Sequence, residues 1–169
     1  MIERAGGTLV IGLGNPIMGD DGTGLAALER LGREWRLPDG VQAVDGGTWG
    51  MRLLPMIEDA DAVLLLDAID GGRAPGALIV LEGDALPRMF GHKLSPHQVD
   101  LREVLAIGEL RGTLPPRLAA VGLQPARVEM STSLSAVVAA EIGTMAAAAA
   151  ARLAQWGHLV PRCREPSVA

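Results

Sequence analysis

The chain has 169 residues, of which 49% are hydrophobic and 21% are charged, as expected of one globular domain with a sizeable core. Its net charge is −5 at pH 7, and it has three Trp, one Phe and no Tyr. The negative net charge disfavours binding to the phosphate backbone of a nucleic acid. The scarcity of aromatic side chains that could stack on bases disfavours binding to single-stranded nucleic acid, so we expect no nucleic-acid partner. One cysteine, Cys163, leaves no intrachain disulfide and no multi-cysteine zinc site.

No segment of the sequence is expected to cross a membrane. The first residues, MIERAGGTLV, do not show the positively charged segment followed by an apolar segment that is typical of a secretory signal peptide. The alanine-rich run between Glu141 and Arg152 holds ten residues, whereas a transmembrane helix needs ~20. We therefore expect a cytoplasmic protein with no membrane partner. We also expect a monomer, because no exposed apolar stripe is evident.

Short apolar runs alternate along the chain with segments of helical spacing. The clearest runs, TLVIGL and AVLLLD, are typical of buried strands in a parallel sheet. After the first run, apolar residues recur at helical spacing from Leu25 to Trp35, with Asp20 or Asp21 as the candidate cap. Strands are expected at residues 8–13, 41–45, 62–67, 77–81 and 118–123, and further helices at residues 51–59, 96–110 and 135–156.

The alternation of strands and helices predicts an α/β fold. We expect a single-domain, twisted, mostly parallel five-stranded sheet with helices on both faces. The domain is expected to span residues 1–156. Residues 157–169 contain two prolines and several charges, which favours a flexible C-terminal tail.

Acidic side chains follow two predicted strands at their carboxyl ends, where sheets of this kind bind ligands. The first strand leads into a glycine-rich loop with Asp20 and Asp21, and the third strand ends in Asp67. The stretch Ser-Pro-His-Gln places His97 at the second position of a helix with a capping-box start. The positive end of the helix dipole disfavours imidazolium there, so we expect His97 to stay neutral, the form that binds a metal.

Each of these features also has an ordinary structural explanation. The glycine-rich loop is compatible with a tight turn and a helix cap, Asp67 with an N-cap or Asx-turn, and His97 with a helix start that binds nothing. Asp20 could cap the helix or compete with Asp21 for a metal. Taken together, two carboxylates and one imidazole make a three-ligand set with open positions that suits zinc or nickel.

Several common motifs are absent from the sequence. Ile17 occupies a position that a dinucleotide fingerprint requires to be glycine, and no Gly-Lys-Ser/Thr follows as in a P-loop. There is no Gly-x-Ser-x-Gly motif, and Cys163 lies among proline and arginine residues near the end of the chain. The sequence therefore predicts neither an organic cofactor nor a serine or cysteine nucleophile.

The sequence nevertheless resembles a known family, the hydrogenase maturation endopeptidases, over residues 9–154. The resemblance depends on five segments in matching order and spacing: GLGNPIMGDDGTG (12–24), DGGTWGMRLLP (45–55), LLLDAID (64–70), PGALIVL (75–81) and KLSPHQVDLREVL (93–105). Ser-Pro-His-Gln in that position is specific to the family, whereas Gly-x-Gly-Asn alone is not.

The resemblance implies a function. Members of this family remove a short C-terminal extension from the large-subunit precursor of a nickel-iron hydrogenase after nickel insertion, so that the new C-terminus closes over the metal centre. The family's metal-contacting positions fall on Asp21, Asp67 and His97, which are also the candidate catalytic residues of an aspartic-type endopeptidase. The first position is Glu in some members, so Asp21 lies within the pattern but has a shorter reach. The nickel is expected to come with the precursor.

A second family feature is the loop of Gly46, Gly47, Thr48 and Trp49, which is expected to flank the substrate. The Trp49 side chain is either an exposed apolar contact for the partner or a packed residue.

The bond-cleaving step and two other functions stay open at this point. Either nickel polarises a carbonyl or a water, or one carboxylate acts as general base without metal. A nickel-dependent chaperone that does not cut is one alternative. A peptidyl-tRNA hydrolase-like enzyme is another, because GLGNP resembles its first loop. However, the thirty residues after Asn15 contain no His, and the chain is acidic.

Overall fold

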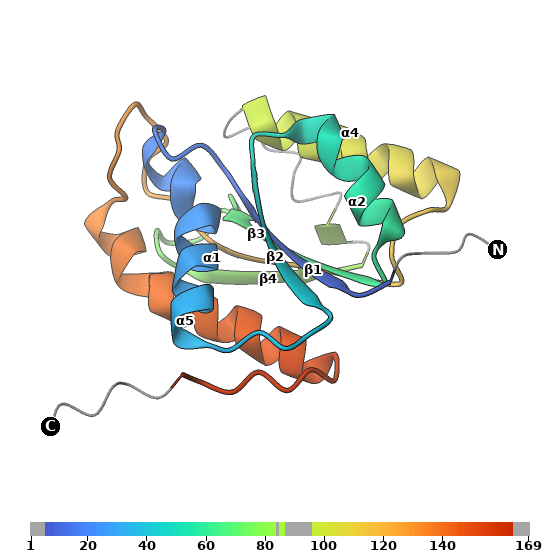
Figure 1. The fold of residues 1–169 in the computed structure, drawn as a ribbon. Helices are drawn as coiled ribbons and strands as arrows, with labels where there is room; N and C mark the ends of the chain where they lie inside the picture. Colours follow the sequence, from blue (N-terminus) through green and yellow to red (C-terminus); the bar gives the residue numbers. More distant parts are fainter. Residues whose placement is uncertain (1–5, 84, 87–95, 164–169) are drawn as a thin grey trace, which may run out of the picture.

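A computed structural model of the chain describes residues 6–83, 85–86 and 96–163, with the backbone alone described at 96–100. Its sheet has the strand order β2-β1-β3-β5-β4 (Figure 1). The strands are β1 (Thr8–Leu13), β2 (Val41–Gly47), β3 (Ala62–Ala68), β4 (Leu78–Glu82) and β5 (Arg117–Leu123). All neighbouring pairs are parallel except β4 with β5. The prediction of a mostly parallel five-stranded sheet is confirmed.

Helices cover both faces of this sheet, as predicted (Figure 1). In the described part of the chain they include the 3-10 turns η1 (Gly19–Gly22) and η2 (Gly50–Leu53) and the α-helices α1 (Thr23–Glu34), α2 (Leu54–Asp59), α4 (Pro96–Arg111) and α5 (Ala136–Gln155). α1 and α5 pack on one face through a cluster that includes Ala27, Leu31 and Met145. α2 and α4 pack on the other face through a cluster that includes Ile57 and Leu105.

The predicted cap of α1 is wrong. The N-cap residue is Gly22, and no side chain caps the helix. Both candidate aspartates lie one turn earlier, in η1, with buried side chains. The carboxylate of Asp20 instead binds a distant segment of the chain.

The last helix, α5, has 20 residues and is long and apolar enough to cross a membrane by length and composition alone. Its buried residues recur every three or four positions, as in Val138, Ile142 and Met145, and pack against the sheet and α1. A core helix of this kind is expected to be apolar on the packed side. The packing therefore accounts for the apolar residues on one side of α5.

Residues after α5 contact the far end of α1. The N–H of Cys163 donates to the Glu34 carbonyl at 2.7 Å, and the Arg162 guanidinium donates to the Glu34 carboxylate at 3.0 Å and lies over the Trp35 ring. His158 shares a hydrogen bond of 2.8 Å with the Thr8 hydroxyl. The described part of the expected tail, up to residue 163, is thus bonded to the domain. The boundary at residue 156 stays a prediction.

Candidate active site

Asp21 and Asp67 lie at the carboxyl ends of the adjacent strands β1 and β3. β1 and β3 are adjacent and in register from Thr8 with Ala62 to Gly12 with Leu66. Asp67 is the next residue of β3, and Asp21 lies in η1 just beyond β1, with no exposed surface on either residue. A carboxylate oxygen of Asp21 accepts the Asn15 N–H at 3.0 Å, and one of Asp67 accepts the Ala68 N–H at 2.8 Å.

Two glycines allow η1 and the start of α1 to lie directly on this sheet edge. A Cβ at Gly24 would overlap the carbonyl oxygens of Leu66 and Leu13, which lie near the carboxyl ends of β3 and β1. A Cβ at Gly14, where φ is +121°, would overlap the Asp21 carbonyl. These close approaches hold the backbone of Asp21 beside the end of β3.

The start of α4 reaches the same edge because of the direction of the helix. Arg111, its last residue, pairs with Glu58 at 3.3 Å, just before β3 begins. The helix has 16 residues, or ~24 Å at 1.5 Å per residue, and a seven-residue strand spans about the same length. His97, the second residue of α4 as predicted, therefore lies level with the carboxyl ends.

The fourth strand, β4, does not end at this edge. β4 is antiparallel to β5, so Glu82 at its end pairs with Ala119, near the amino end of β5. The direction of α4, and not that of β4, therefore places the backbone of His97 toward this edge.

The donor set fits a divalent metal of borderline character, because it combines two carboxylates with an imidazole. Where side chains are described, no group of three His, Cys, Asp or Glu forms a metal cluster. The side chain of His97 lies outside that part of the chain. The set of Asp21, Asp67 and His97 therefore stays a prediction, for catalysis and for metal binding alike.

The predicted substrate loop extends from the end of β2, which runs through Gly46 to Gly47. The Gly14 N–H donates to the Gly47 carbonyl at 3.0 Å and so joins this loop to the one that follows β1. Thr48 is exposed, and Trp49 is 51% exposed. Of the two alternatives for Trp49, the structure shows the exposed one.

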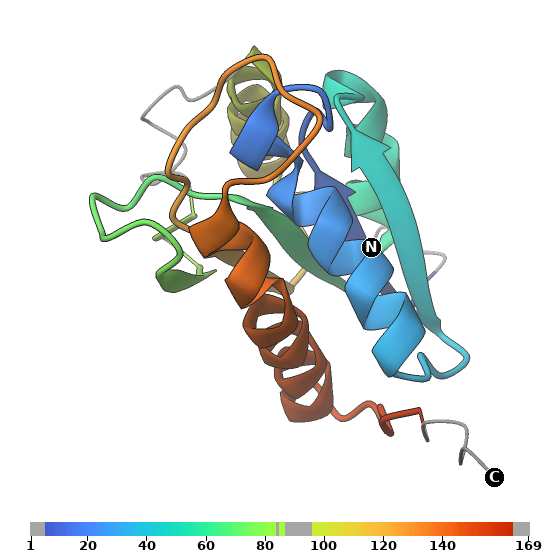
Figure 2. The same ribbon diagram turned by 90° about the vertical axis from the view of Figure 1, so that its left-hand side faces the viewer.

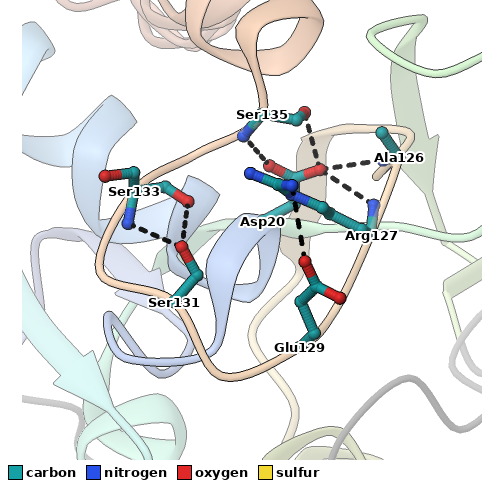
Figure 3. A network of polar contacts seen from close by, with 7 residues as sticks. All are labelled: Asp20, Ala126, Arg127, Glu129, Ser131, Ser133 and Ser135. Carbon is teal, nitrogen blue, oxygen red and sulfur yellow. Dashed lines mark hydrogen bonds and ion pairs between the residues drawn. The ribbon is translucent and has the colours of Figure 1, made fainter.

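Asp20 binds a segment that no sequence pattern had indicated: residues 126–135, between β5 and α5 (Figure 3). One carboxylate oxygen accepts the Ser135 N–H at 2.7 Å. The other accepts the Ala126 N–H at 2.9 Å, the Arg127 N–H at 3.1 Å and the Ser135 hydroxyl at 2.8 Å. Because both oxygens are engaged in this way, Asp20 holds a loop, and Asp21 is the better candidate ligand.

The bonds to Asp20 act against the cost of its burial. Burial raises the pKa of the Asp20 carboxyl, but the hydrogen bonds from Ser135, Arg127 and Ala126 outweigh it and hold the pKa below its usual range. The segment it binds includes residues 126–133, here called the arm, in which no side chain is buried. Ordering these eight residues costs roughly 8–16 kcal/mol of backbone entropy. Burial of apolar side chains in the core does not offset this entropic cost. Hydrogen bonds such as those to Asp20 must therefore offset it.

Asp20→Asn is expected to destabilise the protein by about 2 kcal/mol or more, because the new amide group faces N–H donors inside the protein. Urea unfolding at neutral pH measures the change. Asp39→Asn, at an exposed acid in the turn before β2, is the matched control and should change stability by less than about 0.5 kcal/mol. Equal stability of the two variants would show that Asp20 does not hold the arm.

The fold is that of an α/β protein with two buried acids, Asp21 and Asp67, at the carboxyl edge of its sheet. A family model described as hydrogenase maturation protease matches residues 25–152. The hydrogenase expression/formation protein HupD of Rhodobacter capsulatus is 38% identical over 151 residues, which cover 88% of this chain and 72% of that protein. The hydrogenase 2 maturation protease of Escherichia coli is 37% identical over 135 residues, covering 79% of this chain and 82% of that protein.

Solved structures agree with these sequence matches. The hydrogenase maturating endopeptidase HybD from Escherichia coli superimposes with a TM-score of 0.87 at 34% identity, covering 92% of this chain and 97% of that one. The chain belongs to the hydrogenase maturation protease family, and it is a peptidase.

Proposed function

We propose that this peptidase removes the C-terminal extension of the large-subunit precursor of a nickel-iron hydrogenase after nickel insertion, and that nickel in the precursor is the recognition signal. One observation supports this most directly: in a chain of this family, Asp21 and Asp67 lie buried at the ends of adjacent strands. Two such carboxylates suit a divalent cation that the substrate brings. Because both are buried in the chain alone, the metal must reach them through the loops of this edge.

Within this proposal, the residues of the chain first position the substrate. Asp21, Asp67 and His97 ligate the nickel of the precursor and thereby fix the scissile bond at the sheet edge. The exposed Trp49 and its loop flank the extended peptide.

Two routes then lead to bond cleavage. In one, a carboxylate of Asp21 or Asp67 takes the proton of the attacking water, as in an aspartic-type endopeptidase. In the other, nickel polarises the scissile carbonyl or the water.

Mass spectrometry of purified precursor, incubated with and without this protein, tests the proposal. Nickel-loaded precursor is expected to lose a C-terminal peptide, while metal-free precursor stays intact. Cleavage of both forms would refute nickel as the signal. A stable complex with nickel-loaded precursor of unchanged mass would instead identify a nickel-dependent chaperone.

A further inference from the structure

The arm, residues 126–133, encircles the turn that carries Asp21. Figure 2, which faces the carboxyl edge, shows the segment between β5 and α5 in orange, arching around η1. The Gly19 N–H donates to the Ser131 carbonyl at 2.8 Å, and the Asp20 N–H donates to the Arg127 carbonyl at 3.2 Å. The arm is therefore bonded to the two residues that precede Asp21.

This segment presents apolar surface to solvent. Met130 is 85% exposed, and Ile17 is 53% exposed. The two side chains come from adjacent backbone positions, because the Ser131 N–H donates to the Ile17 carbonyl at 3.0 Å. Exposed apolar side chains at neighbouring positions are a feature of binding sites for protein.

The charge of the arm narrows the choice of partner. Its two charged residues, Arg127 and Glu129, pair with each other at 3.4 Å, so the arm has no net charge. Such a surface is complementary to an apolar patch on a protein and offers no attraction to polyanions or lipid headgroups.

A groove lies between the arm and β2, the strand that leads into the predicted substrate loop. It has a volume of about 470 Å³. Thr132 of the arm, Pro16 of the first loop and Asp45 at the end of β2 all line it. The surface is thus continuous with the edge at which a substrate must be cut.

We propose that the arm, together with Ile17, is a docking surface for an apolar patch of the hydrogenase precursor, separate from the acids that act on the bond. This inference depends on the proposed function for the identity of the partner. The structure favours it because a buried carboxylate, that of Asp20, is devoted to holding an exposed loop. A loop fixed before binding loses less entropy when the partner docks.

Processing kinetics of nickel-loaded precursor with an Ile17→Ser/Met130→Ser double variant test the docking surface. We expect KM to rise roughly tenfold or more, the loss expected from removing two apolar anchors, while kcat stays within about twofold of wild type. Leu110→Ser and Leu159→Ser are the matched controls, because these leucines are 88% and 81% exposed but lie outside the arm. Both controls should retain the wild-type KM.

Direct binding of the uncut precursor, measured by biolayer interferometry, separates this inference from the proposed function. If wild type binds but does not cut, and the double variant does not bind, the docking surface stands and the proposed cleavage fails. Wild-type KM and binding in the double variant overturn the docking surface, even if processing is confirmed. Size-exclusion data in which wild type is a dimer and the double variant a monomer also overturn it, because the arm then binds a second copy.

Discussion

Asp67→Asn is expected to stop the processing of nickel-loaded precursor, with a rate loss of at least about 100-fold, the size typical of removing one group that stabilises the transition state electrostatically. The substitution removes the negative charge that binds the metal or accepts a proton, and changes the shape of the side chain very little. The amide side chain of the variant keeps an oxygen that can accept the Ala68 N–H, which Asp67 accepts at 2.8 Å. The fold should therefore survive, and a thermal melt followed by circular dichroism checks it.

His97→Ala and Asp39→Asn complete this experiment. His97→Ala should also stop processing, because an imidazole is the third predicted ligand. Asp39, exposed in the turn before β2, should be replaceable without loss of rate. If the variant at Asp67 or at His97 matures the precursor at the wild-type rate, the assignment of the site is wrong.

The strands were predictable because their signal is local. Runs such as TLVIGL and AVLLLD are apolar except for one residue at an end, since helices cover both faces of the sheet. The position of Asp67 follows from the end of such a run. The position of His97 at a helix start follows from Ser-Pro-His-Gln, whose order matches the first turn of a helix.

The roles of Asp20 and the arm were not predictable in this way. Asp20 accepts hydrogen bonds from residues 106 to 115 positions further along the chain, and no pattern within a short window marks such a pair. The local signal was misleading, because an acid just before a helix is a common cap. Here Gly22 takes the cap position, and the carboxylate of Asp20 reaches the start of α5 instead. The direction of β4 was not predictable for the same reason, because a single apolar run does not indicate which strand it pairs with or in which direction.

Asp20 and Asp21 are adjacent in one 3-10 turn but have different roles: Asp20 holds the arm, and Asp21 is the predicted ligand. Successive side chains of such a turn point about 120° apart, so the two carboxylates face different surroundings. One binds the loop before α5, and the other is directed to the loop at Asn15. This division makes the placement of η1 critical, and that placement depends on the glycines beneath it.

Gly24→Ala is expected to destabilise the protein by about 3 kcal/mol or more, because the added methyl group would overlap backbone oxygens of Leu66 and Leu13. Backbone atoms cannot rotate away as a side chain can, so α1 and η1 must move off the sheet edge. For a domain of this size, the melting temperature should fall by roughly 6–12 °C. Processing should be lost as well, at temperatures where the variant is still folded, because Asp21 moves with η1.

Gly32→Ala, in the same helix, is the matched control. No atom lies within 4 Å of a Cβ at Gly32, and Ala favours a helix over Gly by about 0.5–1 kcal/mol. This variant should therefore be slightly more stable than wild type and fully active. Differential scanning calorimetry and the precursor assay, run on both variants, separate the contact at Gly24 from a general effect of alanine in α1. If Gly24→Ala melts near the wild-type temperature and still cuts, Asp21 does not owe its position to this close contact.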